Sequence, residues 1–217
     1  MKKIIIAILL LLTASCKSQT ENITDRNKTK TMEKFNTEKY KNLPINPETG
    51  LQILPNGDDV EILKGSNNKG FVERINKANT PYIFFKSFYD NGNLQAEGVS
   101  IYGTIINKHK EFDEKGHLIK EIDYNKDYKF SIEDLQKKMK ETYNVDIMNT
   151  KQTRSVSRTT IDTRIKFPYY QVVVNTGKAS FNNYLLNGNT GEIFYKIEII
   201  RGDERDVIDE YIKTLKK

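Results

Sequence analysis

The sequence lacks tryptophan and has one cysteine and two histidines among 217 residues. A single cysteine allows no internal disulfide bond and no cysteine-based zinc site. The two histidines, His109 and His117, leave few ways to build a Ser-His-Asp or Cys-His arrangement, and a metal pair would need further facing ligands. We therefore expect no metal, no cofactor and no catalysis, and we interpret both histidines as exposed strand or turn residues.

The sequence also lacks an apolar run long enough to span a bilayer. Its longest run, residues 4–12, falls far below the roughly 20 residues that a membrane helix needs. Lys2 and Lys3 precede this run, and the small residues Thr13-Ala14-Ser15 follow it. A basic start, a short apolar core and small residues at a cleavage site are typical of a secretory signal peptide.

Cys16 directly follows the small residues, and this end of the segment resembles the lipobox of bacterial lipoproteins. Thr13 occupies the position where that motif usually has leucine. The resemblance implies that residues 1–15 are removed and that Cys16 carries acyl chains, palmitate among them, as a membrane anchor. The expected location is then the bacterial cell envelope, at the outer rather than the inner membrane. The alternative is a secreted protein cleaved near Ser15, in which Cys16 is incidental.

The charge balance is mild and excludes one class of partner. Removing Lys2 and Lys3 with the signal lowers the formal net charge from +6 to +4. No basic stretch is interleaved with aromatic residues, as single-strand nucleic-acid binders require, so we expect no nucleic acid. Residues 16–42 are rich in Lys, Thr, Asn and Glu and cannot bury enough apolar surface to fold, which predicts a flexible tether.

Two short patterns follow the predicted tether. Residues 43–64 hold turn-forming residues around short apolar pieces, which predicts a hairpin turning at Asn56-Gly57. Residues 69–79 carry Phe71, Val72, Ile75 and Ala78 at helical spacing. This second pattern predicts a short helix that ends at Thr80-Pro81.

Residues 88–97 and 112–121 resemble each other. Each segment has an aromatic residue four places before a glycine, a leucine two places after it and a glutamate five places after it; the glycines are Gly92 and Gly116. Each copy predicts a strand, a tight turn and a returning strand. The pattern is similar to the MORN-like repeat of a bacterial antitoxin-type family. The resemblance implies stacked β-hairpins and suggests an immunity protein that neutralises a toxin in the periplasm.

The C-terminal part predicts a helix followed by an antiparallel meander. Ser131 is the expected N-cap of a helix over 129–143, with Asp134 completing a capping box and Asn144 ending the helix. Strands are predicted over 164–167, 169–175, 179–186 and 193–200, and a C-terminal helix capped by Asp203 over 203–217.

The last turn of this meander, Thr190-Gly191-Glu192 with Asn187 before it, is similar to the closing hairpin of the PepSY domain family. Members of that family occur in propeptides of secreted proteases and in cell-envelope proteins. The resemblance therefore implies a binding role or the restraint of a protease. We also expect Gly191 to supply a positive φ.

Together these patterns predict an α+β fold: antiparallel β-hairpin repeats, then a helix packed on an antiparallel sheet, then a C-terminal helix. The predicted division is a signal at 1–15, a tether at 16–42, a β region at 43–127 and a PepSY-like module at 128–217.

The predicted function is a lipid-anchored, non-catalytic binding protein for a protein or peptide. The alternatives are a toxin-neutralising immunity protein, a PepSY-like protease restraint, and a hydrolase with an unrecognised site near His109 or His117. The candidate binding residues lie on the outward side of residues 82–124 and are Tyr82, Phe84, Tyr89, Tyr102 and Phe112. Burial in the core is the competing interpretation of these aromatic side chains.

Overall fold

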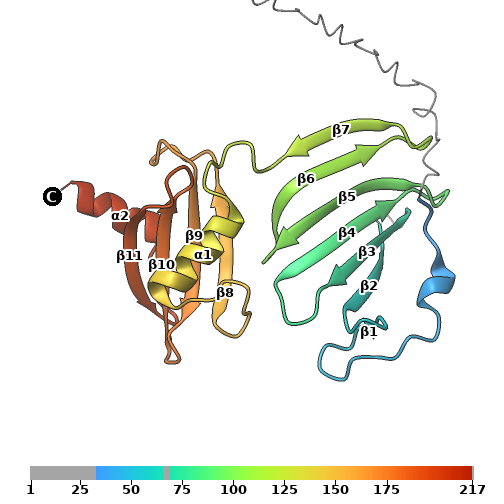
Figure 1. Cartoon of the computed structure of the whole chain (residues 1–217), viewed down its shortest axis with the longest axis horizontal. Helices are drawn as coiled ribbons and strands as arrows, with labels where there is room; N and C mark the ends of the chain where they lie inside the picture. The colour runs from blue at the N-terminus through green and yellow to red at the C-terminus, as the bar shows by residue number, and fades with distance from the viewer. Residues whose placement is uncertain (1–32, 66–68, 217) are drawn as a thin grey trace, which may run out of the picture. The chain divides into compact units, whose positions relative to one another are not determined.

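The computed structural model describes residues 33–65 and 69–216, which form an α+β fold with two antiparallel sheets (Figure 1). The first sheet has seven strands in chain order: β1 (Gln52–Ile53), β2 (Asp59–Lys64), β3 (Phe71–Asn76), β4 (Tyr82–Phe88), β5 (Leu94–Ile101), β6 (Thr104–Phe112) and β7 (Leu118–Asp123). The second sheet has the order β11-β10-β9-β8, with β8 (Thr153–Thr159), β9 (Tyr169–Asn175), β10 (Ser180–Asn187) and β11 (Ile193–Ile200). The α-helices are α1 (Ile132–Tyr143) and α2 (Val207–Leu215), and η2 (Thr37–Tyr40) is a short 3-10 helix before the first sheet.

The predicted signal and Cys16 lie outside the described residues. The end of the predicted tether does not behave as a tether. Phe35 stacks on Phe71 with ring centroids 4.4 Å apart, and Tyr40 is 5% exposed and donates to Glu73. Residues 33–42 therefore pack on the first sheet, which the polar composition of the segment did not indicate. Within the part of the chain that the structure describes, no helix has the length and apolar surface that crossing a bilayer requires.

The two predicted hairpin repeats are confirmed, and their turns are the same. Tyr89 N donates to Asn93 O and Gly92 N to Tyr89 O, each over 2.9 Å, and the corresponding bonds at Asp113 and Gly116 have the same lengths. Gly92 and Gly116 have φ values of 81° and 86°, a region that L side chains rarely adopt. The predicted turn at Asn56-Gly57 is also confirmed, with the same pair of bonds.

The returning strand of each repeat also carries the same bulge. In β5, Ala96 pairs with Ser87 and Leu94 with Phe88, so Gln95 is an extra residue. In β7, Lys120 pairs with Glu111 and Leu118 with Phe112, so Ile119 is an extra residue. Each bulged residue lies three places after the turn glycine. A bulge changes the direction of its side chain, so the repeat places Gln95 and Ile119 equivalently.

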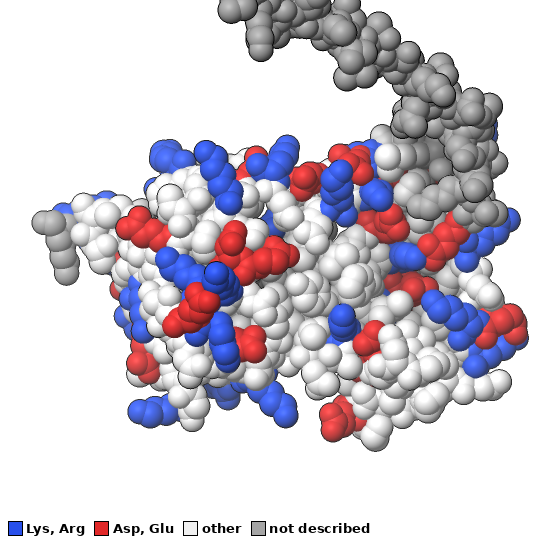
Figure 2. Space-filling view, viewed as in Figure 1, with Lys and Arg blue, Asp and Glu red and all other residues white. Residues whose placement is uncertain are grey.

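A row of alternating charges crosses one face of the first sheet. Direct cross-strand partners join five residues on β3 to β7: Glu73, Lys86, Glu97, Lys110 and Glu121. Opposite charges at such positions stabilise a sheet, and like charges destabilise it. Figure 2 shows the wider pattern, in which acidic and basic side chains are interspersed over the visible face.

The predicted helix over 69–79 is wrong, because these residues form strand β3 and its following turn. Phe71, Glu73 and Ile75 alternate with Val72 and Arg74 along the strand. The buried residue of the strand is Glu73, which accepts a hydrogen bond from the Tyr40 hydroxyl. A polar residue in the apolar series hid the two-residue period, and the remaining apolar residues happened to fit helical spacing.

The second sheet has a helix on each face (Figure 1). Leu135 and Met139 of α1 are fully buried against Val172 and Leu186. Ile101 and Ile106, from β5 and β6, belong to the same apolar cluster. On the other face, Val207 and Ile208 of α2 pack in a cluster with Leu185 and Ile199, among others. Neighbouring residues of β10 therefore serve two different cores.

The expected cap of α1 is confirmed: Ser131 and Asp134 form a capping box, and Asn144 ends the helix in the left-handed conformation. Two other predictions in this region are wrong. Residues 164–167 form no strand; Arg164 is held by Asp162 and Asp209 instead. The N-cap of α2 is Asp206, whereas Asp203 binds Arg205.

Candidate functional site

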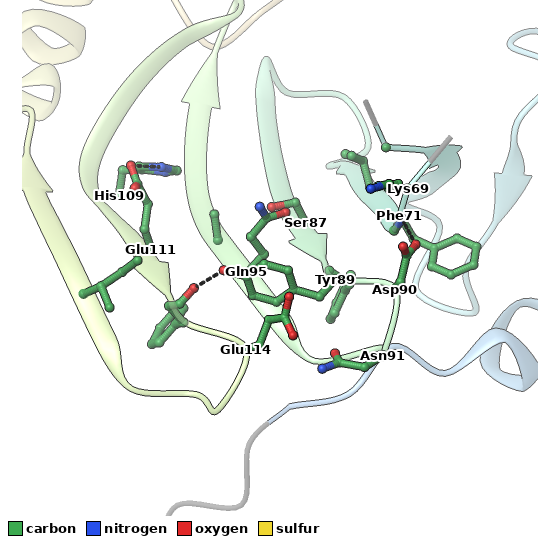
Figure 3. A pocket seen from close by; sticks show the side chains of 17 residues that line it. Lys69, Phe71, Ser87, Tyr89, Asp90, Asn91, Gln95, His109, Glu111 and Glu114 are labelled. Atoms are coloured by element: carbon green, nitrogen blue, oxygen red, sulfur yellow. Dashed lines mark hydrogen bonds and ion pairs between the residues drawn. The ribbon is translucent and has the colours of Figure 1, made fainter. Parts of the chain in front are cut away.

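A hollow of about 770 Å³ lies on one face of the first sheet, beside the turns of the two repeats (Figure 3). Its floor is a row of residues in register across β3 to β6, which are Val72, Ser87, Ala96 and Glu111. The two central residues, Ser87 and Ala96, have small side chains. The hollow therefore exists because the sheet has little side-chain volume at this place while its surroundings are bulky.

Tyr89 and Phe112, two of the predicted binding residues, both line the hollow near the turns. The Tyr89 hydroxyl donates a 2.7 Å hydrogen bond to Phe112 O, which connects the first repeat to the second. Burial raises the pKa of Tyr89, and the carboxylate of Glu114 raises it further. The tyrosine thus presents a neutral phenol and an aromatic ring.

His109 and Glu111 form another side of the hollow, and Figure 3 shows them together, away from Asp90 and Asn91. His109 Nε2 lies 3.6 Å from Glu111 Oε1. The His109 side chain is 15% exposed, so its interpretation as an exposed strand residue is wrong. Its Nδ1 atom is buried and has no hydrogen-bond partner among the described residues. The Phe85 ring, 5.8 Å from the imidazole, covers it on one side.

Phe85 keeps this position because its cross-strand partner is Gly98. A Cβ atom at Gly98 would lie 2.4 Å from Cζ of the phenyl ring, so only glycine lets the ring lie on the sheet. Among the described contacts, no hydrogen bond joins Ser87 to His109, although both line the hollow.

The hollow is acidic, in contrast to the basic chain as a whole. Asp90, Glu111 and Glu114 line it, with Lys69 as the basic residue. Asp90 accepts a hydrogen bond from the Gly70 amide, and Glu111 forms a 3.3 Å ion pair with Lys120. Glu114 has no ion pair within the described chain. A bound segment with basic side chains would thus complete the electrostatics of the hollow.

The other three predicted binding residues lie elsewhere. Tyr82 packs against the cluster beneath α1, and Tyr102 lies in the β5–β6 turn with a φ of 50°, where its hydroxyl donates to Ile147 O over 3.0 Å. Phe84 is 42% exposed and lines a different depression, near Lys86 and Glu97. The structure therefore places two of the five residues at the hollow, while Tyr82 and Phe84 stack on each other with ring centroids 6.4 Å apart.

Sequence reasoning missed Ser87 and Gln95 as lining residues, and it named His109 only under the hydrolase alternative. Gln95 could have been identified from the repeat, because Gln95 and Ile119 both follow the turn glycine by three places and therefore occupy equivalent positions. His117, the other histidine, is exposed and lies 2.9 Å from Asp113. Within residues 33–65 and 69–216, no three His, Cys, Asp or Glu side chains are grouped as a metal site would require.

Comparison of the chain with protein-family models, with curated protein sequences and with solved structures found no significant match in any of the three.

Proposed function

We propose that this chain is a non-catalytic, lipid-anchored binding protein of the bacterial cell envelope, and that its ligand is an extended polypeptide segment. The anchor rests on Cys16 and on the signal-like segment before it. The binding role rests on one observation, which is the hollow beside strand β7. The two are separable, and each has its own test.

Strand β7 is an edge of the first sheet, and among the described strands it pairs only with β6. Leu118 and Ile119 are 52% and 61% exposed there, and Ile119 also lines the hollow. Soluble proteins usually protect such edges, whereas peptide-binding domains use them to add the ligand as one more strand. The free edge and the hollow next to it thus suit an extended chain.

The charge of the hollow defines the ligand further. Its carboxylates favour lysine or arginine side chains, and its aromatic residues Tyr89 and Phe112 favour an apolar side chain between them. The proposed ligand is therefore a strand that alternates basic and apolar residues. Alternation matches the two-residue period with which a strand directs its side chains.

The direct test uses a fluorescent heptapeptide of alternating lysine and leucine, and a control peptide with glutamate in place of lysine. We expect the basic peptide to bind and the acidic one not to bind. Ala96→Leu fills the floor of the hollow and should weaken binding at least tenfold. Ala78→Leu makes the same change at an exposed turn residue and should leave binding unaltered.

Equal binding by Ala96→Leu and the unaltered chain would remove the hollow from the proposal. If the chain cleaves the basic peptide and His109→Asn abolishes this cleavage, the protein is a hydrolase and the non-catalytic binding role is wrong. The anchor is tested by Cys16→Ser with membrane fractionation and radiolabelled palmitate. We expect the variant to lose the label and leave the membranes. Retention of the unlabelled variant at membranes would disprove the lipid anchor without affecting the peptide experiment.

A further inference from the structure

A second hollow, of about 480 Å³, lies on the second sheet, on the face that α2 partly covers. Helix α2 packs over Leu185 and Ile199, whereas Val173, Phe181 and Asn183 line the open part. Three arginines border this part: Arg154, Arg201 and Arg205. The site shares no lining residue with the hollow on the first sheet and is independent of the function proposed above.

Two of these arginines are directed onto one aromatic ring. Arg154 is the extra residue of a bulge in β8, because Thr153 pairs with Val174 and Ser155 with Val173. Its Cζ atom lies 4.6 Å from the Phe181 ring centroid. Arg201 follows β11, where its amide donates to Ala179 O over 2.8 Å, and its Cζ atom lies 5.8 Å from the same centroid.

The charges of these two arginines are not neutralised by any described residue. Neither guanidinium forms an ion pair or a side-chain hydrogen bond within the described part of the chain. Arg205 differs, since it lies 2.6 Å from Asp203 and 3.8 Å from Glu210. An arginine stacked on a ring keeps the N–H groups at its edge free, and these groups match the oxygens of phosphate and carboxylate.

We propose that this hollow binds a phosphate monoester carried on an apolar group. Three arginines and one aspartate line it, which leaves two positive charges, and a phosphate monoester carries about −1.5 to −2 at neutral pH. Arg154 and Arg201 contact the phosphate oxygens, while the apolar part lies against Phe181 and Val173, which line the same face of the sheet.

The test measures binding of phenyl phosphate, benzoate and phenol to the full chain by calorimetry. We expect phenyl phosphate to bind more tightly than benzoate, and phenol not to bind. Arg154→Gln and Arg201→Gln should each weaken phenyl phosphate about tenfold, as loss of a charge-assisted contact predicts. Arg74→Gln is the control, because this exposed arginine lies on the first sheet opposite Glu61. Binding that does not depend on Arg154 and Arg201, or equal affinity for benzoate, would overturn the proposal.

A second arm identifies the source of the phosphate. The full chain with Cys16→Ser, which has no acylated cysteine, is mixed with vesicles containing phosphatidic acid or phosphatidylcholine alone. Binding to phosphatidic acid that Arg154→Gln abolishes would assign the site to a lipid phosphate. Binding of phenyl phosphate without binding of these vesicles would assign it to a soluble phosphate ester. Absence of both would refute the site.

Discussion

The two sheets of this protein differ in what covers them. In the second sheet, Leu185 and Leu186 are adjacent, point to opposite faces and are both fully buried. In the first sheet, a row of charged residues crosses one face and a hollow with Ser87 and Ala96 in its floor occupies the other. The second sheet carries a helix on each face, whereas the first sheet leaves one face open at the hollow.

The sharpest test of this difference compares two identical changes. Leu185→Ala should lower the free energy of unfolding by about 3 kcal/mol, because it opens a cavity between β10 and α2. Leu118→Ala on β7, where the leucine is 52% exposed, should cost less than about 1 kcal/mol. Urea denaturation measures both. Similar costs would mean that the sheets are equally packed.

The next test examines the closing turn of the second sheet. Gly191 has a φ of 69°, as expected, and a Cβ atom there would lie 2.4 Å from the Phe130 ring. Gly191→Ala should cost about 2 kcal/mol through both strain and displacement of the ring. Gly202→Ala, also at positive φ but with open space around it, should cost about 1 kcal/mol. If thermal denaturation shows the same loss of stability for both variants, the close approach of Phe130 to Gly191 adds nothing to the cost of the substitution.

A third test uses pH. Asp162 accepts hydrogen bonds from Arg164, which lower its pKa to about 2, and from the Tyr169 hydroxyl. Because the folded pKa lies below the ordinary aspartate value of 3.8, this stabilisation is present above that value and is lost as pH falls toward 2. Asp162→Asn should cost about 1 kcal/mol at pH 7, since Arg164 is 39% exposed and water screens the pair.

The same variant should show a smaller loss of stability between pH 4 and pH 2 than the unaltered chain. Asp127→Asn is the control, because Asp127 is exposed and has no ion pair within the described residues. Thermal denaturation across this range measures the effect. Parallel pH curves for Asp162→Asn and the unaltered chain would show that the network does not stabilise the fold.

The smallest effect concerns the charged row of the first sheet. Glu97→Lys places three like charges side by side with Lys86 and Lys110 and should cost about 1 kcal/mol at low salt. Glu97→Gln removes one charge without adding another and should lower the free energy of unfolding by only a few tenths of about 1 kcal/mol. Added salt should restore part of the loss, because these side chains are partly exposed. A cost that salt leaves unchanged would indicate a packing effect.

Sequence patterns were sufficient where local chemistry determines the structure. The turns at Gly92 and Gly116 and the cap at Ser131 depend on residues close in the chain, and all were predicted correctly. Strand β3 was missed because its buried residue, Glu73, depends on Tyr40, 33 residues away. Asp203 was taken for a cap although Asp206 has that role, since both aspartates precede the helix.

The site was less accessible to prediction than the fold. Tyr89 and Phe112 were identified as aromatic residues on the outward side of residues 82–124. The floor of the hollow depends instead on strand register, which places Ser87 opposite Ala96. Register also decides that Gln95 and Ile119 are bulged. The alignment of Arg154 and Arg201 on Phe181 likewise joins three separate elements. Such pairings follow from the folded sheet and leave little trace in a single sequence.

The matching turns and bulges also bear on how such a chain can change in length. Each unit contributes one strand pair, its own glycine corner and one redirected side chain, and successive corners are 24 residues apart. Duplicating a unit after β7 would extend the sheet from its open side and lengthen the hollow. It would also carry Tyr124 and Asn125, which follow β7, away from Arg158 on β8, so a longer array requires a new connection to the second sheet.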